Sequence, residues 1–275
     1  MIFWKMHGLG NDYIVIDNRD SKIVDPESQT LARRLCERRF SVGADGLLLV
    51  SSSSQADVRM RIFNADGSEA EMCGNGIRCF AKFCYETGVI KKNEFSVETN
   101  AGVRRVCLTI RDNEVSLVKV DMGAPIWDRQ ALPMVGKGPC INEDLKVDEG
   151  EIYKVTCVSM GNPHCIIFVE NVDEFPVEYI GPMIESHKSF PKRTNVGFVQ
   201  VLNKNELKVR VWERGCGETL ACGTGTCAAV AVANRLGKVK GKVTVHVLGG
   251  NLQVEVGKIL FLTGAAEKVF EGRLF

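Results

Sequence analysis

Short runs that are apolar, or that alternate apolar with polar residues, recur along the chain between turn residues and predict strands. The predicted strands are 13–16, 47–50, 57–63, 94–99, 103–110, 115–121, 165–169, 197–201, 207–212, 242–247, 252–256 and 259–262. Three stretches follow a helical period instead, at 26–39, 77–87 and 226–236. The last two are apolar nearly all round, so we expect both to be buried. Gly88 and Gly237 stand where a helix C-terminal cap glycine belongs.

The stretch from Arg61 to Gly88 recurs without a gap later in the chain. Cys73 corresponds to Cys222, an offset of 222 − 73 = 149 residues, and earlier segments correspond at 162 − 11 = 151, with Asn11 opposite Asn162. An internal repeat fixes the architecture. We therefore predict an α/β fold of the α+β type with two modules related by a pseudo-twofold axis. Each is a curved mixed sheet or barrel wrapped around one central buried helix, with limits of 1–119 and 120–266.

The composition excludes several classes of protein. The 275 residues are 45% apolar and 25% charged, with a net charge of +1, which gives no reason to expect nucleic acid or an anionic membrane as partner. The start of the chain lacks the pattern of a signal peptide, and no apolar run is long enough to span a bilayer, so we expect a cytoplasmic protein. Eleven cysteines without a Cys-x-x-Cys pair argue against a disulfide framework and a zinc site. Five of them lie in apolar runs and are expected to be buried: Cys36, Cys84, Cys107, Cys157 and Cys165.

Cys73 and Cys222 differ from the other cysteines, because each starts a Cys-Gly-x-Gly element directly before a predicted buried helix. Unpaired N–H groups and the helix dipole at such a place favour a thiolate and can cradle a carboxylate. A twofold relation would put one sulfur on each side of a substrate Cα. One thiolate would remove the Cα proton and the opposite thiol would return one, while both helix ends stabilise the enediolate charge. No pyridoxal cofactor and no metal are implied. A redox dithiol needs a narrower separation of the sulfurs and stays open as an alternative.

The chain closely resembles the diaminopimelate epimerase family over nearly its whole length. The matching motifs are 5–12 (KMHGLGND), 63–68 (FNADGS), 72–76 (MCGNG), 159–164 (SMGNPH), 195–198 (NVGF), 213–215 (ERG) and 221–223 (ACG). The resemblance implies a pyridoxal-independent isomerase that interconverts LL- and meso-diaminopimelate, in lysine and peptidoglycan precursor biosynthesis. It also implies a homodimer, and a C-terminal segment, 267–275, that packs back on the first module.

The same resemblance implies roles for particular residues. Cys73 and Cys222 are the catalytic thiols, and His164 and Glu213 handle thiol protons or orient the substrate amine. Arg214 suits the distal carboxylate through its planar fork. The substrate contacts are Asn11, Asn64, Asn162, Asn195, Glu213 and Arg214, and the backbone cradle for the reacting carboxylate is Gly74, Asn75, Gly223 and Thr224.

Some residues depart from the family pattern. Ala44-Asp45-Gly46 replaces a segment that carries a substrate-binding glutamine in some members, Thr224 stands where serine is common, and Phe270 stands where a tyrosine often marks the dimer contact. Plainer interpretations also exist, since an Asn beside Gly is a common turn former, His164 could be a core histidine, and Glu213 with Arg214 an ordinary ion pair. A racemase of another amino acid, a thiol redox protein and a non-catalytic binding module stay open as alternative functions.

Overall fold

The computed structural model describes residues 1–147 and 150–274. Internal contacts divide the chain into two compact units. Unit 1 is Met1–Asp121 together with Thr263–Phe275, and unit 2 is Met122–Leu262.

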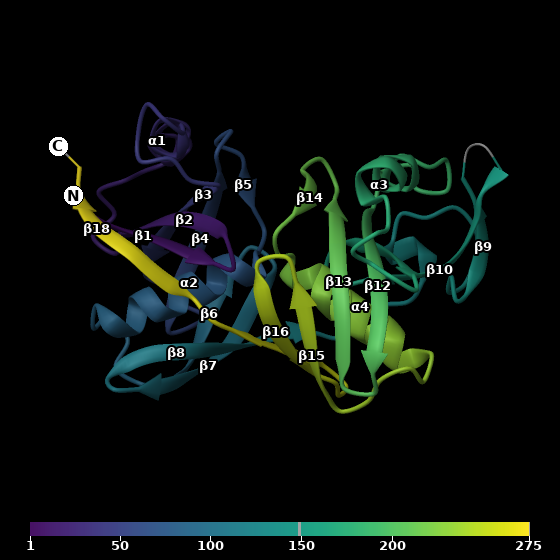
Figure 1. Cartoon of the computed structure of the whole chain (residues 1–275). Helices are drawn as coiled ribbons and strands as arrows, with labels where there is room; N and C mark the ends of the chain where they lie inside the picture. The colour runs from purple at the N-terminus through teal and green to yellow at the C-terminus, as the bar shows by residue number, and fades with distance from the viewer. Residues whose placement is uncertain (148–149, 275) are drawn as a thin grey trace. The chain divides into compact units, whose positions relative to one another are not determined.

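Unit 1 is a mixed sheet with two helices (Figure 1). Strand β1 pairs antiparallel with β2, β2 parallel with β3, β3 antiparallel with β4, and β4 parallel with β6. Strand β18, from the C-terminal end of the chain, pairs antiparallel with β1. The elements are β1 (Ile2–Gly8), β2 (Asn11–Asp17), α1 (Glu27–Cys36), β3 (Gly46–Ser51), β4 (Val58–Asn64), β5 (Glu69–Ala70), α2 (Gly74–Glu86), β6 (Glu94–Thr99), β7 (Gly102–Arg111), β8 (Glu114–Gly123) and β18 (Glu267–Arg273).

Unit 2 repeats the same order of pairing. Strand β10 pairs antiparallel with β11, β11 parallel with β12, β12 antiparallel with β13, and β13 parallel with β15. The elements are η1 (Arg129–Ala131), β9 (Glu143–Lys146), β10 (Ile152–Ser159), β11 (Pro163–Phe168), α3 (Val177–Glu185), β12 (Asn195–Asn203), β13 (Glu206–Glu213), β14 (Gly217–Thr219), α4 (Gly223–Arg235), β15 (Lys242–Val247), β16 (Gly250–Glu255) and β17 (Leu260–Gly264). The predicted mixed α/β class is confirmed, and both units share one connectivity.

Each unit is built around one buried helix. Helix α2 packs against β1, β2, β3, β4 and β7, and α4 packs against β10, β11, β12, β13 and β16 (Figure 1). Every residue from Gly74 to Cys84 is buried, as the all-round apolar pattern predicts. Both helices begin three residues before their predicted starts, because the Gly-x-Gly segment already forms the first turn. Gly88 and Gly237 adopt positive φ angles of 73° and 69° after the last turn, which confirms the cap prediction.

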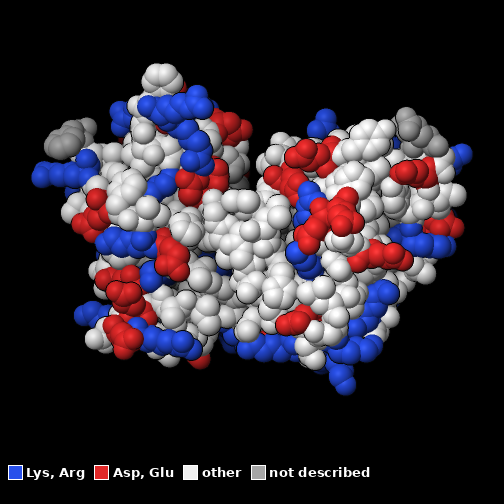
Figure 2. Space-filling view, in the orientation of Figure 1, with Lys and Arg blue, Asp and Glu red and all other residues white. Residues whose placement is uncertain are grey.

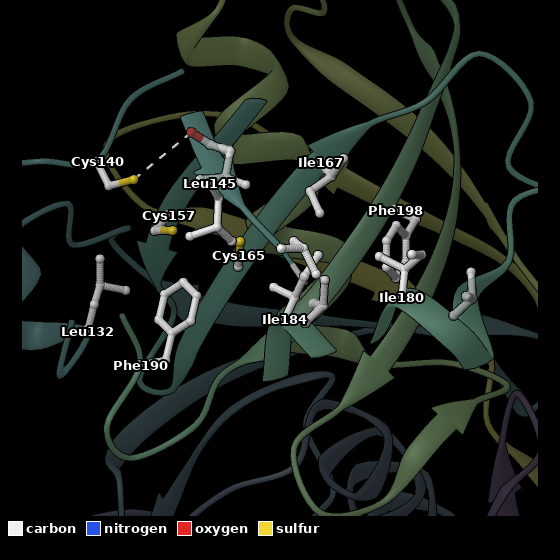
Figure 3. Packing of buried hydrophobic residues seen from close by; sticks show 14 of the residues in the cluster. Leu132, Cys140, Leu145, Cys157, Cys165, Ile167, Ile180, Ile184, Phe190 and Phe198 are labelled. Carbon is white, nitrogen blue, oxygen red and sulfur yellow. Dashed lines mark hydrogen bonds between the residues drawn. The ribbon is translucent and has the colours of Figure 1, made fainter. Parts of the chain in front are cut away.

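Helix α3 was not predicted from the sequence. Pro176 precedes it and Pro182 lies inside it, and these residues break the helical pattern. It packs against β12 and β13 and contributes Ile180 and Ile184 to the core of unit 2, beside Phe198 (Figure 3). A Cβ at Gly181 would lie 2.6 Å from the Trp212 ring, so only glycine permits this approach.

Charged side chains of both signs are mixed on the face drawn in Figure 2, with wide uncharged areas between them, in keeping with the small net charge. Within the described residues, no helix has the length and apolar character needed to cross a membrane. The prediction of buried cysteines is confirmed for Cys36, Cys84, Cys157 and Cys165. It is wrong for Cys107, which is only half-buried because its β7 side chain faces Glu94 at 3.6 Å.

Candidate active site

Cys73 and Cys222 occupy the same position in their respective units. Each is the N-cap residue of the central helix, with extended backbone angles (φ −138°, ψ 126° and φ −119°, ψ 112°). A helix N-terminus presents backbone N–H groups that lack a partner inside the helix. A Cβ at Gly225 would lie 3.3 Å from the sulfur of Cys222. The glycine therefore leaves room for the thiol over the first turn.

The Cys222 sulfur is enclosed by polar groups of unit 2. The Gly225 N–H donates to it at 3.4 Å, and the Thr224 hydroxyl lies at 3.5 Å. Glu213 also hydrogen-bonds the thiol and is held in place by the Thr219 hydroxyl at 2.6 Å.

These surroundings decide the protonation state of Cys222. Burial, and then the charge of Glu213, raise the pKa of Cys222 well above its usual range, against the lowering effect of the Thr224 and Gly225 donors. Cys222 is therefore a thiol. The expectation that the helix N-terminus favours a thiolate is wrong for this residue, because desolvation and an adjacent carboxylate outweigh the helix donors.

The Cys73 sulfur is half-buried and meets a different set of partners in unit 1. The Tyr13 hydroxyl donates to it at 3.0 Å, and the Asn11 Oδ1 lies 3.7 Å away. Asn75, from the first turn of α2, donates to the same Asn11 oxygen at 3.2 Å. Asn11 is held in turn by Asp45, which accepts from its Nδ2 at 2.7 Å. No carboxylate hydrogen-bonds Cys73 in the way that Glu213 bonds Cys222, as far as the described contacts extend.

A second polar group of unit 2 forms around His164. Its imidazole is fully buried and its Nε2 lies 2.9 Å from Asn162 Oδ1. Burial, and then the charge of Arg214, lower the pKa of His164 to about 3, so the ring is neutral. The neutral ring donates from Nε2 to Asn162, which leaves Nδ1 as an acceptor. That atom is buried without a hydrogen-bond partner within the described chain.

Asn195 orients the residue that follows β13. Its side chain donates to Pro163 O at 2.8 Å and accepts the backbone N–H of Arg214 at 2.9 Å. The Arg214 guanidinium is exposed and donates to Lys192 O at 3.3 Å. The backbone of Arg214 is thus fixed while its charged end faces solvent.

The predicted site residues form three groups and one separate residue. Asn11, Cys73, Gly74 and Asn75 lie together in unit 1, whereas Asn64 is exposed at the end of β4 and donates to Ser68 at 2.9 Å. In unit 2, Glu213, Cys222, Gly223 and Thr224 form one group, and Asn162, His164, Asn195 and Arg214 form another.

Tyr13 also belongs to the group around Cys73, although its sequence pattern predicts only a strand at 13–16. The offset of 151 places Tyr13 opposite His164, since 164 − 13 = 151, and both side chains contact the Asn two residues before them. Asp45 was noted only as a departure from the family pattern, although it positions Asn11. Among the described residues, no group of three or more His, Cys, Asp or Glu is arranged to hold a metal ion.

Comparison with solved structures identifies the class of fold. The chain aligns over its full length with a hydroxyproline epimerase from Agrobacterium vitis, with a TM-score of 0.76, 16% identity and 90% of that chain covered. It aligns equally fully with a phenazine biosynthesis protein of the PhzF family from Bacillus anthracis, with a TM-score of 0.74, 19% identity and 99% coverage. At this level of identity the likeness concerns the fold alone, which epimerases and racemases share with other enzymes.

The sequence comparisons are more specific. The family model described as diaminopimelate epimerase matches residues 3–127 and 156–269. The diaminopimelate epimerase of Moorella thermoacetica is 53% identical over 99% of this chain and 98% of its own length. That of Methanococcus maripaludis is 49% identical over 100% and 99%. The chain belongs to the diaminopimelate epimerase family.

Proposed function

We propose that this isomerase converts LL-2,6-diaminopimelate to meso-diaminopimelate by moving one Cα proton between two thiols, without pyridoxal phosphate. The observation that supports this most directly is the repeated helix start, with Cys73 and Cys222 as N-cap residues in two units of identical connectivity. The product would serve lysine and peptidoglycan precursor biosynthesis.

In the proposed reaction each thiol acts on one face of Cα. The thiolate form of Cys73 removes the Cα proton, and the electron pair of the broken C–H bond moves onto the substrate carboxylate as an enediolate. Cys222, which the described surroundings keep protonated, donates its proton to the opposite face. The N–H groups of the two helix starts, at Gly74, Asn75, Gly223 and Thr224, would cradle the enediolate, and one such donor is typically worth about 3–4 kcal/mol.

Glu213 supports the proton balance of this scheme. After turnover Cys222 is a thiolate, and for the next cycle it must regain a proton while Cys73 loses one. The Glu213 carboxylate hydrogen-bonds the Cys222 sulfur, so it is placed to relay that proton. His164 is neutral with an unsatisfied Nδ1, and an acceptor of this kind suits the ammonium group of the substrate.

The remaining polar residues are assigned to the ends of the substrate. Arg214 would bind the distal carboxylate, with Asn64 and Asn195 on the distal amino-acid centre, and Asn11 and Asn162 beside the reacting one. The two copies of the repeat differ here, because Glu213-Arg214 stands where the first copy has Asn64-Ala65. A racemase of a simpler amino acid has no use for a second cation at this place.

The test is incubation with LL-diaminopimelate in D₂O. We expect meso-diaminopimelate with one solvent deuterium at the inverted Cα, detected by chiral separation and mass spectrometry. Alanine, lysine and histidine run in parallel distinguish the alternative racemase. Faster inversion of one of these would refute the substrate, and no exchange on any of them would refute the thiol mechanism.

We further propose that the two units are the two modules expected at 1–119 and 120–266, and that the protein is a cytoplasmic homodimer. None of the eleven cysteines, all within the described residues, is in a disulfide bond, which suits a reducing compartment. Strand β18 exposes the neighbouring apolar residues Val269 and Phe270 (56% and 45%), which suit a contact with a second copy. Light scattering on the wild type and on Phe270→Asp tests this, since the variant should be monomeric.

A further inference from the structure

The Tyr13 hydroxyl lies between two acceptors of unit 1, with Asn11 Oδ1 at 2.7 Å and the Cys73 sulfur at 3.0 Å. A phenol has one hydrogen to donate, so it serves one of them at a time. We propose that Tyr13 is a positioning residue that turns its hydrogen from Asn11 to Cys73 when the thiol ionises, and thereby stabilises the Cys73 thiolate. This rests on the proposed function, in which Cys73 gives up and regains a proton.

The orientation of each amide in this group is fixed by its neighbours. Asp45 can only accept, so the Asn11 Nδ2 must face it, at 2.7 Å, and the Asn11 oxygen must face Tyr13. Arg78 can only donate, and its Nη2 lies 3.0 Å from Asn75 Oδ1, so the Asn75 Nδ2 must face Asn11. Asp45 is itself held by Arg38 at 2.9 Å. The donor and the acceptor of each hydrogen bond in this chain are therefore fixed, and the Asn11 atom that faces Tyr13 is the acceptor oxygen Oδ1.

Asn11 Oδ1 has three donors around it for two lone pairs: Tyr13, Asn75 at 3.2 Å and the Cys73 thiol at 3.7 Å. When Cys73 is a thiol, its S–H is directed to Asn11. When Cys73 loses its proton, the sulfur becomes an acceptor only, and Tyr13 turns to it. Asn75 still donates to Asn11 in that state, so no buried polar atom loses its last partner. The switch therefore avoids the cost of an unsatisfied group.

The repeat shows that the two thiols are tuned by different side chains. Tyr13 corresponds to His164, and Asn64 corresponds to Glu213. On Cys73 the aromatic partner donates to the sulfur and Asn64 is turned to Ser68. On Cys222 the Glu213 carboxylate bonds the thiol and favours its protonated form. The two thiols therefore have different partners, a phenol hydroxyl beside Cys73 and a carboxylate beside Cys222.

Other titratable groups near Cys73 do not take this role. Cys79 on α2 is fully buried, and burial raises its pKa to about 12. Arg78 donates to Gly74 O, Asn75 Oδ1 and Ala265 O. Burial, and then the charge of Cys73, raise the pKa of Tyr13 well above its usual value, so the phenol keeps its hydrogen. The remaining charged groups around these residues are Lys5, Asp12, Arg38, Asp45 and Glu267.

The experiment measures thiol ionisation without substrate. Wild type and Tyr13→Phe are alkylated with iodoacetamide over a range of pH, and the rate at each cysteine is followed by peptide mass spectrometry. We expect the midpoint for Cys73 to rise by about one to two pH units in Tyr13→Phe, which at 1.36 kcal/mol per unit corresponds to a hydrogen bond to a charged group. The exposed Cys216 in unit 2 serves as internal reference. Tyr153→Phe, which removes a hydroxyl bound to Glu151 at 2.5 Å, is the matched control and should leave Cys73 unchanged.

An unchanged Cys73 midpoint in Tyr13→Phe would overturn the inference, as would an equal shift at Cys216, which would indicate a general change in the protein. The acid limb of the kcat/KM profile should move to higher pH by the same amount as the Cys73 midpoint. The alkylation result does not depend on turnover. A Cys73 shift in a protein that fails to invert diaminopimelate would therefore refute the proposed function and leave the role of Tyr13 in Cys73 ionisation intact.

Discussion

Arg210 and Glu218 are joined by two parallel hydrogen bonds, from Nε to Oε1 at 2.6 Å and from Nη2 to Oε2 at 2.9 Å. The same pair recurs in unit 1, where Arg61 holds Glu69 at 2.8 and 2.9 Å. Each pair joins a long strand to the short strand that precedes Cys73 or Cys222. A bidentate, partly buried ion pair fixes the geometry of its two strands better than an exposed one. We conclude that the two ion pairs fix the path of the backbone that leads into the first turn of each helix.

Arg210→Lys should lower the free energy of unfolding by about 2 kcal/mol, because a lysine cannot reproduce the fork and leaves carbonyl acceptors without a donor. Those acceptors include Val172 O and Phe175 O, each 3.0 Å from the guanidinium. Urea unfolding measures the change. Lys208→Ala on the same strand removes an exposed pair with Asp173 and should cost less than about 0.5 kcal/mol. Equal losses in the two variants would contradict this account.

Cys73→Ala and Cys222→Ala should each abolish epimerisation while the protein stays folded. Each removes the only proton carrier assigned to one face of Cα, and a Ser replacement should also be very slow, since an alcohol holds its proton far more tightly than a thiol. Turnover of LL-diaminopimelate and circular dichroism provide the two measurements. Cys216→Ala is the matched control, because Cys216 is also flanked by glycines but is exposed. Near-normal turnover in Cys73→Ala or Cys222→Ala would refute the two-thiol mechanism.

The buried, neutral His164 should lower the free energy of unfolding as the pH decreases. Its pKa is about 3 in the folded protein, against an ordinary value of 6.5, through burial and the charge of Arg214. Between about pH 6.5 and pH 3 the unfolded chain therefore binds a proton on His164 that the folded protein does not. The free energy of unfolding that is present above about pH 6.5 is lost as the pH falls toward 3, by at most about 1.36 kcal/mol per pH unit. Urea unfolding between about pH 7 and 5 should show a shallower slope in His164→Gln. His246→Gln, at a half-buried site, should keep the wild-type slope, and an unchanged slope in His164→Gln would argue against the buried neutral ring.

The elements that the sequence predicts well are those whose pattern is local. The strands around Tyr13 and Leu47 and the helices after Cys73 and Cys222 follow from apolar periodicity and flanking glycines, and each lies within a few residues of its predicted limits. Helix α3 could not be predicted because Pro176 and Pro182 disrupt the period, and its stability comes from packing against β12 and β13. The pairing of β18 with β1 joins the two ends of the chain and has no local signal.

In the site, too, local sequence features can be predicted and features that depend on the folded structure cannot. Cys73, Cys222 and their glycines are visible as a repeated motif, and the carboxylate beside one thiol is visible as the change from Asn64 to Glu213. The protonation state of Cys222 is not visible, because burial and the charge of Glu213 act through the folded structure. The contact of Tyr13 with Cys73 joins residues 60 positions apart, and only the repeat offset to His164 points to it in the sequence.

Arg214 should be the residue that selects diaminopimelate over simpler amino acids. Asn195 fixes its backbone N–H at 2.9 Å while the guanidinium remains exposed, so the fork is available to a distal carboxylate. Losing a charge-assisted hydrogen bond typically costs about 1.5–3 kcal/mol. Arg214→Ala should therefore lower kcat/KM for diaminopimelate by about 10- to 150-fold. Arg214→Lys should also be impaired, because a point charge does not reproduce two parallel hydrogen bonds.

The matched control for Arg214 is Lys192→Ala, which removes an exposed neighbouring cation but keeps the carbonyl oxygen that accepts from the Arg214 guanidinium at 3.3 Å. It should leave kcat/KM near the wild-type value, since no substrate contact is assigned to it. Turnover of alanine, lysine and histidine by the same variants separates substrate recognition from chemistry. If Arg214→Ala keeps full activity on diaminopimelate, or loses activity on every amino acid alike, Arg214 does not read the distal carboxylate. The proton transfer between Cys73 and Cys222 would stand in the first case, because neither thiol depends on the charge of Arg214 for its proton.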